Sequence, residues 1–197
     1  SSDPGRLYYK LNSDFLKSKL ATTTGKTSKE INSEITIPNS DGVLERFTVW
    51  ESSNFEPELQ AKYPEIRAYE GSGLDDKSAK IHFSVSPLGV QTMVFRANKV
   101  TEFIEVNPDN RTEYVLFAKN GSSSQKLICK TTNDISNTKA TAKTAKVQSN
   151  TKIFKTMRLA LSCTGEYTAY FGGTKAAALA GMNATLTRVN GVFNKDL

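Results

Sequence analysis

Histidine and cysteine are scarce in this sequence, and their scarcity excludes several kinds of chemistry. The 197 residues include one histidine, His82, and two cysteines, Cys129 and Cys163. Peptidases build a catalytic zinc site from at least two imidazoles, so this chain cannot supply one by itself. A nucleophilic cysteine would need His82 as its base, and we therefore expect Cys163 to be a packed core thiol.

Long apolar runs and a concentrated charge are also missing. No stretch approaches the ~20 apolar residues that cross a bilayer, and we expect no membrane span. The sequence has neither an initiator methionine nor an apolar signal core, so its start, SSDPGRLYY, is compatible with a mature end or with an arbitrary boundary. Lysine and arginine exceed aspartate and glutamate by 26 to 20, but the lysines are scattered. We interpret them as solvated surface charge and expect no nucleic-acid partner.

Alternation of apolar and polar residues predicts closely spaced strands between about residues 31 and 117, which is typical of an antiparallel sheet. Aromatic residues of these strands recur at period two, so we expect them to pack in the core rather than to form a carbohydrate platform. They are Phe47, Trp50, Phe83 and Phe95. The clearest strands are expected at 44–50, 79–85, 90–95, 100–106 and 114–117.

Two short helices are predicted beside the strands. Ser13 can cap the first, which places Phe15, Leu16 and Leu20 on a small apolar face. The second is expected near residues 56–62, where Pro57 suits the first turn.

The last third of the chain changes in composition twice. Residues 130–152 are polar and lack aromatics, so they cannot bury enough surface to fold, and we expect an exposed linker open to proteolysis. A strand is then expected at 156–164, followed by a helix at 174–193. One face of that helix carries apolar residues at spacings of three and four, Leu179, Met182, Leu186, Val189 and Phe193. One strand and one helix cannot close a core, so they either pack on the first domain or begin a second one.

Residues 158–190, RLALSCTGEYTAYFGGTKAAALAGMNATLTRVN, resemble the start of the catalytic domain in bacterial reprolysin-like zinc metalloproteases of the metzincin type. Upstream, ITIPNSDGVLERFTVWES and YEGSGLDDKSAKIHFSVSPLGVQTMVF are similar to the pro-region of the same family. The resemblance covers about residues 30–197. It implies an α+β chain with a mainly antiparallel β pro-domain at 1–129, a linker with the activation cleavage region at 130–152, and the first strand and helix of an α/β metzincin catalytic domain at 153–197.

The resemblance also implies a function. The precursor would be a secreted zinc metalloendopeptidase, its signal peptide already absent, whose pro-domain inhibits and helps to fold its own catalytic domain as partner. Such proteases hold zinc with H-E-x-x-H-x-x-G-x-x-H. That motif is absent here, so we expect no catalytic or metal-binding residue, no activity of this chain alone, and zinc only in a domain beyond it.

Cys129 is the candidate inhibitory residue that the resemblance adds. In related zymogens a pro-region thiolate takes the fourth zinc position and displaces the catalytic water. A disulfide between Cys129 and Cys163, or an inert thiol, stays open as an alternative. For the whole chain, the alternative function is a secreted β-sandwich module for binding or adhesion, with residues 153–197 packed on its sheet.

Overall fold

The computed structural model describes residues 5–25, 32–119 and 157–196, and it divides the chain into two compact units. One unit is Ser1–Gly121 with Cys163–Leu197, and the other is Ser122–Ser162. The first unit contains the regular structure described below. The linker expected at 130–152 and the thiol of Cys129 lie outside the described residues.

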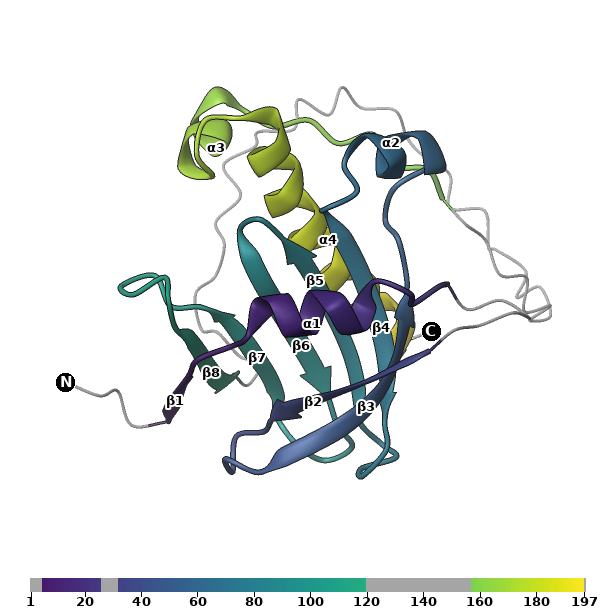
Figure 1. Ribbon diagram of the computed structural model, residues 1–197, viewed down its shortest axis with the longest axis vertical. Coiled ribbons are helices and arrows are strands. Elements are labelled where there is room, and N and C mark those ends of the chain that lie inside the picture. Colours follow the sequence, from purple (N-terminus) through teal and green to yellow (C-terminus); the bar gives the residue numbers. More distant parts are fainter. Residues whose placement is uncertain (1–4, 26–31, 120–156, 197) are drawn as a thin grey trace, which may run out of the picture. The chain divides into compact units, whose positions relative to one another are not determined.

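Eight strands of the first unit form one curled antiparallel sheet, shown in Figure 1, in the order β1-β8-β7-β6-β5-β4-β3-β2. Strands β2 to β8 follow one another as an up-and-down meander, and β1 returns to pair with β8. The strands are β1 (Arg6–Tyr9), β2 (Ser33–Pro38), β3 (Leu44–Glu51), β4 (Arg67–Gly73), β5 (Lys80–Ser86), β6 (Gly89–Phe95), β7 (Thr101–Val106) and β8 (Tyr114–Lys119). The expectation of an α+β chain with an antiparallel sheet is confirmed.

The described part of the chain also holds four helices, α1 (Ser13–Leu20), α2 (Pro57–Lys62), α3 (Gly165–Tyr170) and α4 (Lys175–Asp196). The cap of helix α1 is Asn12, one residue before the expected Ser13, because the side chain of Asn12 accepts the backbone N–H of Phe15 at 3.0 Å. Pro57 occupies the first turn of α2, as expected. None of the described helices is long and apolar enough to cross a membrane.

The core lies between the inner face of the curled sheet and α1. Side chains alternate between the two faces of a strand, so Ile81 and Phe83 of β5 point inward together while His82 points to the outer face. Leu20 of α1 closes the core and Leu16 packs against it, whereas Phe15 is 59% exposed. The largest fully buried side chains of the sheet are Phe47, Val49, Ile81, Phe83, Val94 and Leu116.

Two expectations for the last third are wrong. Residues 157–164 form neither helix nor strand, and Thr164 instead caps α3, which the sequence did not predict, by accepting the N–H of Tyr167 at 3.3 Å. The physical reason is that a strand needs a neighbour to pair its backbone groups, and none of the described strands pairs with this segment. The side chain of Cys163 is exposed rather than packed in the core.

Candidate docking interface of the last helix

Helix α4 packs on the outer face of the sheet, opposite α1, over β4, β5 and β6 (Figure 1). Its start is defined by Thr174, whose hydroxyl accepts the N–H of Ala177 at 3.1 Å. Two glycines precede it, and Gly172 and Gly173 both have positive φ, which side chains other than glycine rarely adopt. The ring of Phe171 lies under Gly181, so α3 and α4 are held as a pair.

A cluster of amides and one hydroxyl attaches the middle of α4 to the loop after β3. Nδ2 of Asn54 donates to Oδ1 of Asn183 at 2.8 Å and lies 2.9 Å from Oγ1 of Thr187. Asn190 returns a bond from its Nδ2 to Oδ1 of Asn54 at 2.8 Å, and Nδ2 of Asn183 donates to the backbone oxygen of Arg67 at 3.1 Å. Asn183 is 1% exposed, so its side-chain amide bonds to protein groups at this contact rather than to water. We call Asn54, Asn183, Thr187 and Asn190 the amide clasp.

At Gly191, next to the amide clasp, helix α4 lies close to the sheet over His82. A Cβ added at Gly191 would lie 3.0 Å from the imidazole carbons of His82, so the glycine sets the spacing. The imidazole is 9% exposed and stands edge-on to Phe95, with ring centroids 6.2 Å apart. Burial lowers the pKa of His82 below its usual value, although the charge of Glu70, 3.9 Å from Nδ1, acts in the opposite direction. The neutral imidazole is therefore the form that fits under α4.

An ion pair fixes the other flank of α4. Nη2 of Arg188 lies 2.6 Å from Oε1 of Glu105 on β7, and its guanidinium stands 5.2 Å from the ring centre of Phe103. Small residues fill the rest of the contact, and Ala180 and Ala184 are 3% and 7% exposed. On the side of α4, the interface is thus built from amides, small side chains and one charge, whereas the sheet presents the rings of His82, Phe95 and Phe103.

The large apolar side chains of α4 lie elsewhere on the helix. We call them the apolar stripe: Leu179, Met182, Leu186, Val189 and Phe193. Each residue turns an α-helix by about 100°, so these positions fall on a side well separated from Ala180, Ala184, Thr187 and Gly191. Val189 is 39% exposed and Phe193 is 59% exposed, and the other three are half-buried.

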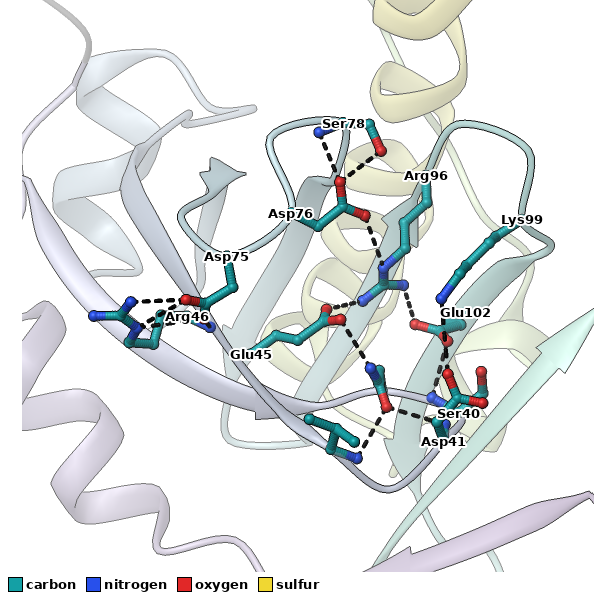
Figure 2. Close-up of polar contacts among 12 residues, drawn as sticks. Ser40, Asp41, Glu45, Arg46, Asp75, Asp76, Ser78, Arg96, Lys99 and Glu102 are labelled. Atoms are coloured by element: carbon teal, nitrogen blue, oxygen red, sulfur yellow. Dashed lines mark hydrogen bonds and ion pairs between the residues drawn. The ribbon is translucent and has the colours of Figure 1, made fainter.

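A buried charge cluster, separate from α4, joins three turns of the sheet (Figure 2). Arg96, at the end of β6, has a side chain that is 1% exposed and is ion-paired with Glu45, Glu102 and Asp76. Burial would lower the pKa of Arg96, but its hydrogen bond to Glu45 and the charge of Glu102 raise that pKa overall. Because Glu102 also accepts the N–H of Ser40 at 2.9 Å, one guanidinium ties the β2–β3, β4–β5 and β6–β7 turns together.

The exposed neighbours of this cluster are simple surface pairs. Arg46 binds Asp75 through its Nη2 at 2.7 Å, and Lys99 lies 3.7 Å from Asp41. The hydrogen bond from Arg46 holds the pKa of Asp75 below its usual range. The three carboxylates that meet at Arg96 each pair with its guanidinium across different turns, and we therefore interpret this cluster as structural.

The sequence-predicted site residues are dispersed. His82 lies under α4, and Cys163 has an exposed thiol 3.5 Å from Oγ1 of Thr168. Cys129 lies outside the described residues. The inhibitory role of Cys129 and its bridge to Cys163 therefore stay predictions. Phe47 and Phe83 pack in the inner core as expected, while Trp50 faces outward and donates from Nε1 to Glu70 at 2.7 Å. Sequence reasoning missed the amide clasp, because isolated asparagines carry no periodic signal.

A catalytic zinc site does not fit the described residues. Zinc needs several imidazole, thiolate or carboxylate groups that converge, and among the described residues no group of three or more such side chains is placed so that it could hold a metal ion. The single imidazole, His82, has its one nearby carboxylate at 3.9 Å and is covered by Gly191. Comparison of the chain with protein-family models, with curated proteins and with solved structures gave no match.

Proposed function

We propose that this chain is the pro-domain and the first segment of the catalytic domain of a secreted zinc metalloendopeptidase precursor. In this proposal the sheet, within residues 1–129, inhibits the protease and helps it to fold, and residues 130–152 are cut on activation. Helix α4 then belongs to the protease, and Cys129 stays the candidate inhibitory thiol. The resemblance of residues 158–190 to the start of such catalytic domains gives the family, and the two faces of α4 are the structural observation that carries the proposal.

The sheet has a core that is complete without α4, which supports the division into two bodies. The continuous core cluster draws its side chains from α1 and from strands of the sheet, and no residue of α4 belongs to it. In the contact with the sheet, α4 instead contributes its part of the amide clasp, small residues and one partner of an ion pair, and the sheet contributes the rings of His82, Phe95 and Phe103. Contacts between domains are typically more polar than a domain core, and this interface has that character.

The apolar stripe supports the second body. An amphipathic helix buries its apolar face against the core of the domain to which it belongs. In α4 the face toward the sheet is small and polar, and the face with Val189 and Phe193 is open. Large apolar side chains gathered on one exposed face mark an interaction site, and the occupant that this proposal names is the sheet of the protease domain.

The segment just before α3 also exposes large apolar side chains. Met157, Leu159 and Leu161 alternate along it and are 87%, 65% and 51% exposed, although no described strand pairs with it. Alternation with period two is the pattern of a strand with one buried face. A segment with alternating apolar residues and a helix with an open apolar face are compatible with the start of an α/β domain whose remaining strands are still to be added.

Reading the codons that follow residue 197 tests the family directly. We expect H-E-x-x-H-x-x-G-x-x-H downstream in the same frame, with the three histidines as zinc ligands and the glutamate as general base. A stop codon directly after Leu197 contradicts the proposal.

The apolar stripe provides a second test with a matched comparison. Val189→Ser with Phe193→Ser should leave the unfolding midpoint of the 197-residue chain near its wild-type value, because both side chains are exposed there. The same pair in the whole precursor should lower the yield of folded, zinc-dependent peptidase. Equal effects in both proteins would show that no further domain covers the stripe.

A secreted binding module is the second candidate, and one observation favours it. Helix α4 is hydrogen-bonded to the sheet in the same compact unit, which needs no further domain. The β-sandwich expected for that alternative is wrong, because the eight described strands form one continuous sheet. A chain ending at residue 129 that loses its cooperative unfolding would favour this candidate, whereas the pro-domain proposal expects that shorter chain to fold.

A further inference from the structure

A small cavity opens at one end of the curled sheet, beside α1, and no residue of α4 lines it. Its volume is about 220 Å³. Helix α1 contributes Ser13 and Lys17, the β5–β6 turn contributes Ser86, and the start of β8 with the loop before it contributes Tyr114 and Arg111. Segments far apart in the sequence therefore converge on one polar pocket.

Two buried hydroxyls of this pocket keep a hydrogen to donate. Ser86 and Tyr114 are 7% and 8% exposed. The Ser86 hydroxyl accepts the N–H of Leu88 at 3.1 Å, and the Tyr114 hydroxyl accepts the N–H of Val90 at 3.3 Å. A hydroxyl that accepts one bond still has its own hydrogen, so each can donate to a ligand in the pocket.

The charge of the lining is of one sign. Lys17 and Arg111 are cations, and no aspartate or glutamate lines the pocket. Within the described ranges neither cation has an ion-pair partner, in contrast to Arg46, Arg67, Arg96 and Arg188. Two unpaired cations beside buried donors give a positive potential that attracts anions.

The pocket is small, and its wall is fixed. Its volume lies below the roughly 300–1,000 Å³ of sites for drug-sized ligands, so it suits one small group rather than a large cofactor. Gly89 has φ +111°, and a Cβ there would lie 2.4 Å from Cγ2 of Val106 and 3.1 Å from the hydroxyl of Tyr114. The turn backbone thus packs directly against the pocket lining, which holds the donors in place before a ligand arrives.

We propose that this pocket binds a small oxyanion, a carboxylate or a phosphate group. Arg111 presents a planar fork that matches two oxygens of such a group, and Lys17 adds a compact charge from α1. Ser86 and Tyr114 donate from the floor. The inference is independent of the proposed function, because it depends only on the end of the sheet that α1 covers.

Titration of the 197-residue chain with sodium phosphate and with sodium acetate, at an ionic strength held constant with sodium chloride, tests this inference by calorimetry and by backbone amide NMR shifts. We expect saturable binding with shifts at residues 86–90 and 111–114. Arg111→Gln and Lys17→Gln should each weaken the affinity about tenfold, as expected for the loss of a charge-assisted contact. Tyr114→Phe should weaken it severalfold. Lys19→Gln, which removes an exposed lysine of the same helix outside the pocket, should bind like the wild type.

The two probes also separate the sources of the anion. Tighter binding of phosphate assigns the pocket to a phosphorylated ligand, and tighter binding of acetate assigns it to a carboxylate. The inference is overturned if neither probe binds saturably. It is also overturned if Arg111→Gln and Lys19→Gln bind equally well, because the pocket then contributes nothing to anion affinity.

Discussion

At the residue scale, Arg96 is the side chain on which the turns at one end of the sheet depend most. Its guanidinium is 1% exposed and holds the carboxylates of Glu45 and Glu102, which are 13% and 5% exposed. Arg96→Met keeps much of the volume but leaves two nearly buried carboxylates without their cation. We expect it to lower the free energy of unfolding by about 3–5 kcal/mol, measured by urea denaturation.

Arg46→Met is the matched control, because it breaks an exposed pair with Asp75 on the neighbouring turn. Its unfolding midpoint should stay close to that of the wild type, since exposed ion pairs contribute little. Equal losses in the two variants would contradict the role that we assign to the buried cluster.

His82 gives the chain a dependence on pH at the α4 interface. Its pKa is lowered by burial in the folded protein, so the unfolded chain binds more protons in the range below about pH 6.5. The stability that neutral His82 allows is fully present above that pH and is lost as the pH falls toward the lowered pKa. Unfolding measured between about pH 7.5 and 5 should show this loss, and His82→Gln should flatten it. A His82→Gln chain with the wild-type slope would assign the effect to other groups.

At the element scale, α4 is held by the amide clasp, and Asn183 is its centre. Asn183→Ala removes the acceptor of Asn54 and the donor to the oxygen of Arg67, and it leaves buried polar groups unpaired. We expect α4 to be destabilised by about 1–3 kcal/mol. Limited proteolysis within α4 measures this loss. Asn194→Ala, at an exposed position of the same helix, should be cut at the wild-type rate, and equal rates for both variants would contradict the amide clasp.

The elements also show how far sequence reasoning reaches. The helix at 174–193 and its apolar stripe were predictable, because spacings of three and four are a local signal. Which face of α4 contacts the sheet was not predictable, since the contact uses Asn183 and Gly191 rather than the apolar stripe. The strand expected at 156–164 failed for a related reason: alternation favours a strand, but only a neighbour completes one. Lys17 and Arg111, at two sides of the pocket, are 94 positions apart along the chain and gave no sequence signal.

At the scale of the whole molecule, the sheet and α4 belong to one compact unit, which our proposal divides into two bodies. The meander closes its core with α1, and α4 lies on the opposite face of the sheet (Figure 1). That face presents polar and aromatic side chains such as His82 and Phe95 to α4. In the precursor that we propose, such a domain would hold the first helix of the protease and later release it. Under that proposal the polar bonds of the contact have a reason, because a polar surface tolerates exposure to water once a helix has left.

Amide hydrogen exchange of the 197-residue chain, resolved residue by residue, tests this arrangement most directly. If α4 is an attached element, its amides should exchange through a local opening with a lower free energy than those of β5, whose exchange should need global unfolding. Asn183→Ala should speed exchange in α4 and leave β5 unchanged. If α4 and β5 instead open with the same free energy and respond together to Asn183→Ala, α4 is part of the sheet's own cooperative fold, and the division into two bodies is wrong.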